Sequence, residues 1–122
     1  MARDAVTVTD LVSGAGTTNP AGTAITPANG ANIAGVKDSS RVVVRVTNTN
    51  GTNRVVTFKA GDNPPAVRKG LGDLAVTVPA TTGDKLIVLE SARFVKADGS
   101  IDVDFGASMA GVISAVRLPR EV

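Results

Sequence analysis

The sequence predicts an all-β domain, a jelly-roll-like β-sandwich, with an immunoglobulin-like sandwich as the alternative. Three observations support this prediction. Short segments alternate apolar and polar residues with a period of two, as strands with one buried face do. Turn-forming residues separate these segments, and valine, which favours strands, is the commonest residue. Periodicity does not reveal strand order, so both topologies stay open.

The clearest strand is the segment of residues 41–47. Val42, Val44 and Val46 fall on one face of this segment, which indicates that this face points inward. The Asn50-Gly51 pair follows, and both residue types tolerate the positive φ angles of tight turns. We therefore expect a hairpin in which residues 41–47 pair with residues 54–60.

Four more segments are predicted as strands: residues 74–78, 85–91, 101–105 and 112–118. Pro79 ends the first of them because proline cannot donate a ladder hydrogen bond. Residues 85–91 are apolar on both faces, which favours a central position in a sheet. A hairpin turn is expected at residues 97–100, and no segment is predicted as a helix.

The N-terminal third differs in character from the rest of the single domain, which spans residues 1–122. Residues 1–4 are expected to form a short arm, and residues 5–9 alternate as a strand does. Residues 13–40 are rich in Gly, Thr, Asn and Pro, with Ile25, Ile33 and Val36 as larger apolar anchors. We expect one or two short strands there, at 23–26 and 31–36, laid across the sandwich or exposed to a neighbour.

The composition argues against most chemistry. Without Cys or His, the chain lacks thiolate nucleophiles, imidazole bases and the usual zinc ligands, so we expect no enzyme and no cofactor. The net charge is +2 with the basic residues spread out, and there are three Phe but no Tyr or Trp, which argues against nucleic-acid binding. No apolar run is long enough to span a bilayer or to act as a signal peptide. We therefore expect no membrane role, and we expect synthesis in a cytoplasm.

Three carboxylates close in sequence, Asp98, Asp102 and Asp104, are the strongest candidates for a metal site or an acid–base pair. However, Asp98-Gly99 is typical of a turn, and the other two occupy the polar side of an alternating strand. We therefore expect surface carboxylates, no metal and no catalytic residue.

The loop of residues 61–72 is the segment best suited to recognition of a partner. Its prolines restrict φ, its glycines permit tight turns, and two adjacent basic residues are presented from this stiffened frame. The equally weighted alternative is that Val67 and Leu71 pack the loop over one end of the sandwich. The candidate contact residues are Arg3 in the N-terminal arm and, in the loop, Asn63, Pro64, Pro65, Arg68 and Lys69.

Several segments resemble small head proteins of tailed bacteriophages, namely capsid decoration or minor capsid proteins. The segments are KAGDNPPAVRKGLGDL (59–74), AVTV (75–78), VLESARF (88–94), ADGSI (97–101) and VRLP (116–119). The resemblance covers roughly residues 40–119. It implies a jelly-roll-like virion protein, commonly a homotrimer, that binds the major capsid protein on the outer capsid surface and reinforces the shell, with no cofactor.

Two other functions remain open. A phage tail-tube or neck subunit is the structural alternative. A carbohydrate- or ligand-binding β-sandwich belongs to a different class, and the absence of Trp and Tyr argues against it.

Overall fold

A computed structural model gives the fold and describes residues 3–12, 14–36, 42–61, 69–89 and 91–118. These residues form nine strands and two single helical turns, which confirms the all-β class. The strands are β1 Asp4–Asp10, β2 Thr23–Ala24, β3 Ala31–Ala34, β4 Val42–Asn48, β5 Arg54–Phe58, β6 Leu74–Val78, β7 Gly83–Val88, β8 Ile101–Phe105 and β9 Val112–Arg117. The helical turns are η1 Lys69–Leu71 and α1 Ser91–Phe94, neither of which the sequence pattern predicts.

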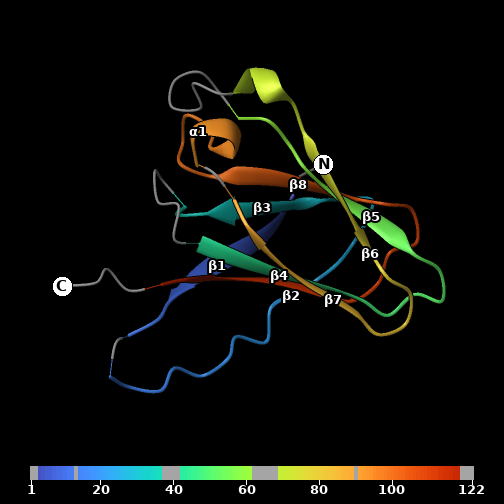
Figure 1. Cartoon of the computed structure of the whole chain (residues 1–122), viewed down its shortest axis with the longest axis horizontal. Helices are drawn as coiled ribbons and strands as arrows, with labels where there is room; N and C mark the ends of the chain where they lie inside the picture. Colours follow the sequence, from blue (N-terminus) through green and yellow to red (C-terminus); the bar gives the residue numbers. More distant parts are fainter. Residues whose placement is uncertain (1–2, 13, 37–41, 62–68, 90, 119–122) are drawn as a thin grey trace.

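The strands form a nearly closed, barrel-like sandwich with the order β6-β5-β8-β3-β1-β9-β4-β7 (Figure 1). Strand β1 joins the two halves of this arrangement: its residues 4–7 pair parallel with β3, and its residues 8–10 pair parallel with β9. The first sheet is therefore β6-β5-β8-β3 with the start of β1. The second sheet is the end of β1 with β9, β4 and β7, and β2 pairs with β9.

The core lies between the two sheets and confirms the inward rows that the sequence predicts. Val42, Val44 and Val46 of β4 are fully buried, as are Ile101 and Val103 of β8. Burial of a side chain of this size stabilises the fold by roughly 1.5–3 kcal/mol relative to its exposure. Strands β6 and β9 also lie where the pattern predicts them.

The predicted hairpin between β4 and β5 is wrong. Strand β4 pairs with β7 and β9, whereas β5 pairs with β6 and β8, so the chain crosses here from the second sheet to the first. The cause lies in Asn48, whose side chain is fully buried. Its Nδ2 donates to the carbonyl oxygens of Thr52, Val78 and Pro79, and its Oδ1 accepts from the backbone N–H of Asn50. These side-chain bonds stabilise an arch between sheets in place of a tight hairpin turn.

The predicted central position of residues 85–91 is also wrong. Strand β7 is the last strand of the second sheet, and β4 is the strand that pairs with it among the described residues. Ile87 is buried, but Leu86 is 71% and Val88 is 65% exposed. An apolar run on both faces therefore marks, in this chain, an edge strand with an exposed apolar side.

The N-terminal third is confirmed as strand-forming, but β3 is more than an element laid across the sandwich. It lies inside the first sheet between β1 and β8, and Ile33 is fully buried. The Asn32 side chain donates to Ser100 and Asp102 of the neighbouring segment. Residues 14–19 are exposed, and Figure 1 shows this part of the chain as a long loop beside the sheets.

The predicted hairpin turn at residues 97–100 is a turn, but it does not join paired strands. The backbone N–H of Lys96 donates to Ser100 O at 2.8 Å, and Asp98 Oδ1 accepts from both the N–H and the hydroxyl of Ser100. The turn connects α1 to β8, and β8 pairs with β3 and β5. The prediction of a turn was therefore correct, but the prediction that this turn joins two paired strands was wrong.

Candidate functional site

Most of the predicted loop contacts fall in a part of the chain that the structure does not describe. Asn63, Pro64, Pro65 and Arg68 lie outside the described residues, and Lys69 begins η1. The structure does describe both ends of the loop, and these show how it is attached to the sandwich.

The loop is attached at its base to the α1 turn. Gly61 donates to Arg93 O at 2.9 Å, and a Cβ on Gly61 would lie 2.2 Å from Val95 O, so only glycine fits this approach. Arg93 Nε donates in turn to Gly72 O at 3.0 Å on the other side of the loop. Turns α1 and η1 are neighbours at the same end of the molecule (Figure 1).

An ion pair closes the base of the loop. Lys59 Nζ lies 2.9 Å from Asp73 Oδ2, and Asp73 Oδ1 accepts the backbone N–H of Ala60 at 2.7 Å. The Ala60 hydrogen bond, followed by that of Lys59, holds the pKa of Asp73 below its ordinary value. The Asp73 hydrogen bond raises the pKa of Lys59.

Arg3, the predicted contact in the N-terminal arm, is bound to its own chain. Its guanidinium donates to Val103 O and to Asp104 Oδ1, both at 2.7 Å, and its Nε lies 3.6 Å from Asp102 Oδ1. The side chain is 29% exposed. Arg3 therefore fastens the start of β1 to β8, and a partner would meet it as part of a charge cluster.

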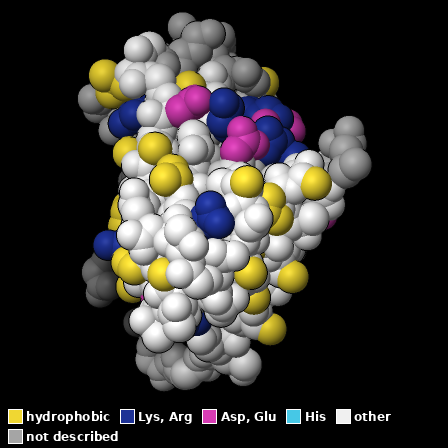
Figure 2. Space-filling model, turned by 90° about the vertical axis from the view of Figure 1, so that its right-hand side faces the viewer, with side chains coloured by type: hydrophobic (Ala, Val, Ile, Leu, Met, Phe, Trp, Pro, Cys, Tyr) yellow, Lys and Arg dark blue, Asp and Glu magenta, His cyan; other side chains and the backbone are white. Residues whose placement is uncertain are grey.

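This charge cluster lies on the first sheet and alternates in sign. Its members are Arg3, Lys59, Asp73, Lys96, Asp102 and Asp104. Figure 2 shows oppositely charged side chains gathered side by side on one end of the molecule, with hydrophobic side chains scattered around them. Because such a cluster is largely neutralised internally, it presents no strong field of one sign to a partner.

The three carboxylates considered for metal binding do not converge. Asp98 is bound to Ser100, Asp102 lies 3.1 Å from Lys96 Nζ, and Asp104 is bound by Arg3. Over the described ranges there is no group of three or more His, Cys, Asp or Glu side chains that could hold a metal ion. The same ranges contain no helix long and apolar enough to cross a membrane.

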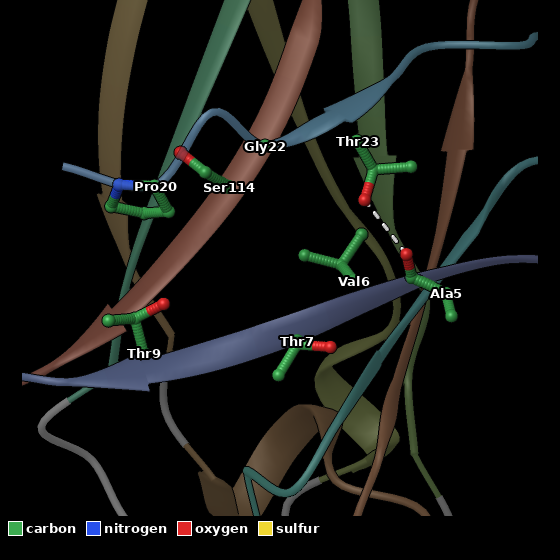
Figure 3. A pocket seen from close by; sticks show the side chains of 8 residues that line it. All are labelled: Ala5, Val6, Thr7, Thr9, Pro20, Gly22, Thr23 and Ser114. Atoms are coloured by element: carbon green, nitrogen blue, oxygen red, sulfur yellow. Dashed lines mark hydrogen bonds between the residues drawn. The ribbon is translucent and has the colours of Figure 1, made fainter. Parts of the chain in front are cut away.

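A small pocket of about 210 Å³ lies between β1 and the segment that leads into β2 (Figure 3). It is lined by Ala5, Val6, Thr7, Thr9, Pro20, Gly22, Thr23 and Ser114. Thr23 Oγ1 donates to Ala5 O at 2.8 Å across its rim. The lining offers hydroxyls and aliphatic groups but no ionisable side chain, and its volume is below that of typical ligand pockets.

The outer face of the second sheet is the surface that the sequence pattern missed. Val43 of β4 lies opposite Val88 of β7 on one side and opposite Val116 of β9 on the other. These three residues form an apolar row across the sheet, and Leu86 extends it along β7. Val43 and Val116 are half-buried, whereas Val88 and Leu86 are exposed. Residues 85–91 are apolar on both faces, which could have indicated this surface, but we interpreted that pattern as a central strand.

An ion pair borders the apolar row. Arg45 binds the Asp84 carboxylate with three hydrogen bonds, from Nε to Oδ1 at 3.0 Å and to Oδ2 at 3.2 Å, and from Nη2 to Oδ2 at 2.8 Å. The Arg45 side chain thereby lowers the pKa of Asp84, and Asp84 raises the pKa of Arg45. The outer face thus combines exposed aliphatic side chains with charges that are already paired, a combination suited to contact with another protein.

Comparison with protein-family models, curated proteins and solved structures gave no match to this chain.

Proposed function

We propose that the chain is a structural protein of a bacteriophage virion that binds the outer capsid surface and reinforces the shell, with the major capsid protein as its partner. The observation that carries this proposal is the apolar row Val88-Val43-Val116 with Leu86 on the outer face of the second sheet. An exposed strand face of this kind fits a protein surface better than it fits a small ligand.

The loop of residues 61–72 supplies a second, independent contact in this proposal. Gly61, Asp73 and Arg93 attach its two ends to the sandwich. A loop held at its base loses less conformational freedom when it docks than a free loop does. The predicted contacts in it, together with Arg3, remain candidates for the capsid interface.

Weak contacts are sufficient for a protein that binds a shell in many copies. Each aliphatic side chain that becomes buried contributes roughly 1.5–3 kcal/mol. Repetition over a symmetric lattice multiplies such contributions, so no single strong site is needed.

The proposal includes the finer fold assignment and the assembly state. We assign a jelly-roll-like sandwich in which β1, parallel to both of its neighbours, departs from the antiparallel pattern. A homotrimer on the virion exterior, made in the host cytoplasm, is what the resemblance implies.

The experiment mixes purified protein with undecorated phage heads. We expect co-sedimentation with the heads and a higher unfolding temperature of the shell. Val43→Lys places a charge in the middle of the apolar row and should weaken binding at least about tenfold. Val12→Lys, at a residue 60% exposed outside the row, is the matched control. The proposal fails if the unaltered protein neither sediments with the heads nor stabilises them.

A tail-tube or neck subunit is the second candidate. Strands β6 and β7 are both terminal in the strand order, and head-to-tail pairing of β6 with β7 of the next copy would close a ring or extend a tube. Rings or tubes of the purified protein in electron micrographs would favour this candidate.

A further inference from the structure

Strand β7 has one side along which no described strand is hydrogen-bonded to it. It ends the strand order, and its residues 83–88 pair antiparallel with β4. A strand at a sheet edge presents backbone N–H and C=O groups to any chain that can lie beside it. Leu86 and Val88, 71% and 65% exposed, add apolar side chains to this edge.

Charge is distributed unevenly along β7. Asp84 and Lys85 occupy its first half, and Leu86, Ile87 and Val88 occupy its second half. A second β7 lying parallel and in register would place Lys85 beside the Lys85 of the other copy, which like-charge repulsion disfavours. An antiparallel arrangement moves the charged halves to opposite ends.

Two antiparallel registers can be compared directly. In an antiparallel pair, residues opposite each other have their side chains on the same face. When two copies are related by a two-fold axis perpendicular to the sheet, one residue must therefore lie opposite its own counterpart, with the axis midway between them. If that residue is Leu86, Asp84 faces Val88 and Lys85 faces Ile87, which opposes charges to aliphatic groups. If it is Ile87, Leu86 faces Val88 of the other copy on both sides of the axis, so the three central pairs are all apolar. The charged residues Asp84 and Lys85 then fall opposite positions 90 and 89, beyond the end of β7.

We propose that two copies of this chain pair through β7, antiparallel and centred on Ile87, so that their second sheets become one continuous sheet. The Arg45–Asp84 pair, with its closest contact at 2.8 Å, neutralises the carboxylate near each end of the joint. The Lys85 ammonium groups of the two copies lie four residues apart along the strands, roughly 14 Å. This pairing needs no capsid and competes with the homotrimer that the resemblance implies, which would give a three-chain mass in solution. Binding to phage heads is measured separately, so failure of the pairing and failure of the proposed function are distinguishable.

The first test is the mass of the free protein by light scattering or sedimentation. We expect a species of twice the 12.3 kDa chain mass, or an even multiple of it. Leu86→Arg places a cation opposite Val88 and should weaken the pairing at least about tenfold, so that single chains predominate. Val12→Arg should leave the mass unchanged, and circular dichroism of each variant verifies the fold.

The second test uses the absence of cysteine from the chain. In the proposed register, a double variant Leu86→Cys and Val88→Cys brings each new thiol opposite a thiol of the other copy, and oxidation should yield covalent dimers. Either single variant lacks an opposed thiol and should cross-link several-fold less. The proposal is overturned by a single-chain or three-chain mass of the unaltered protein, by a Leu86→Arg variant of unchanged mass, or by stronger cross-linking of the Leu86→Cys single variant.

Discussion

The side-chain amide of Asn48, at the end of β4 in the second sheet, donates to the carbonyl oxygen of Val78, at the end of β6 in the first sheet, at 3.2 Å. Asn48 is fully buried, and the same amide also reaches Pro79 O. Strands β4 and β6 are not paired with each other in the strand order. One polar side chain thus links the two sheets where the sandwich is nearly closed.

Replacement of this residue should be costly. Asn48→Ala leaves the carbonyl oxygens that it binds without a donor and opens a cavity, so we expect a loss of roughly 2–4 kcal/mol in the free energy of unfolding. Asn53→Ala is the matched control, because Asn53 is exposed and its Oδ1 accepts a hydrogen bond from the backbone N–H of Ala80. Denaturant titration of both variants gives the comparison. Equal losses at the two positions would show that the amide of Asn48 does not link the sheets.

Glycines at two tight contacts provide a second test. A Cβ on Gly83 would lie 2.0 Å from Pro79 O, and one on Gly111 would lie 2.3 Å from Thr47 O. Both obstacles are backbone atoms, and Gly111 also has a φ of +133°. Gly111→Ala and Gly83→Ala should therefore each destabilise the fold by more than about 2 kcal/mol.

The control for these substitutions is Gly51→Ala, where nothing lies within 4 Å of the added Cβ. This change should be neutral or slightly stabilising, because alanine restricts the unfolded chain. Thermal unfolding of the three variants measures the difference. A stable Gly111→Ala variant would contradict the packing of β9 against β4 described above.

Sequence periodicity predicted which segments form strands but not which strands are neighbours. The inward row of β4 follows directly from its alternation, since a buried face requires apolar residues at every second position. The arch at Asn48 was not predictable, because Asn50-Gly51 suits a hairpin equally well and only the distant Val78 and Pro79 carbonyls decide the outcome. Long-range partners of this kind leave no local pattern.

The candidate interaction surface was hidden for the same reason. Leu86 and Val88 have the composition of a buried strand, and their exposure follows from the position of β7 at a sheet edge. Lys85, a residue often found on edge strands, was the one local indication. Arg3 likewise could not be assigned to β8 before the parallel pairing of β1 with β3 was known.

Acid should weaken the fold through the Arg45–Asp84 pair. The pKa of Asp84 is lowered in the folded state, so its contribution to stability is present above the unfolded carboxyl value of about 3.9 and is lost as pH falls through the lower folded value. Asp73, whose pKa is also lowered, acts in the same direction. We expect the Tm to fall on acidification below about pH 4.

A variant pair tests the cause of this dependence. Asp84→Asn and Arg45→Gln each remove one member of the pair, so both should lower the Tm at neutral pH and make it less sensitive to acid. The double variant should resemble either single one. Additive effects of the two substitutions would mean that the residues act separately, contrary to their contact at 2.8 Å.

The N-terminal end of β1 should loosen when Arg3 is replaced. Arg3→Ala removes the hydrogen bonds to Val103 O and Asp104 Oδ1, and we expect a loss of about 1 kcal/mol in global stability. The larger effect should be local: amide exchange at Asp4, whose N–H donates to Gly30 O at 3.1 Å, should become faster while exchange in β4 is little changed. Arg3→Lys keeps the charge but not the planar guanidinium, so it should restore only part of the protection. Unchanged exchange at Asp4 in the alanine variant would show that Arg3 does not hold the start of β1 against β8.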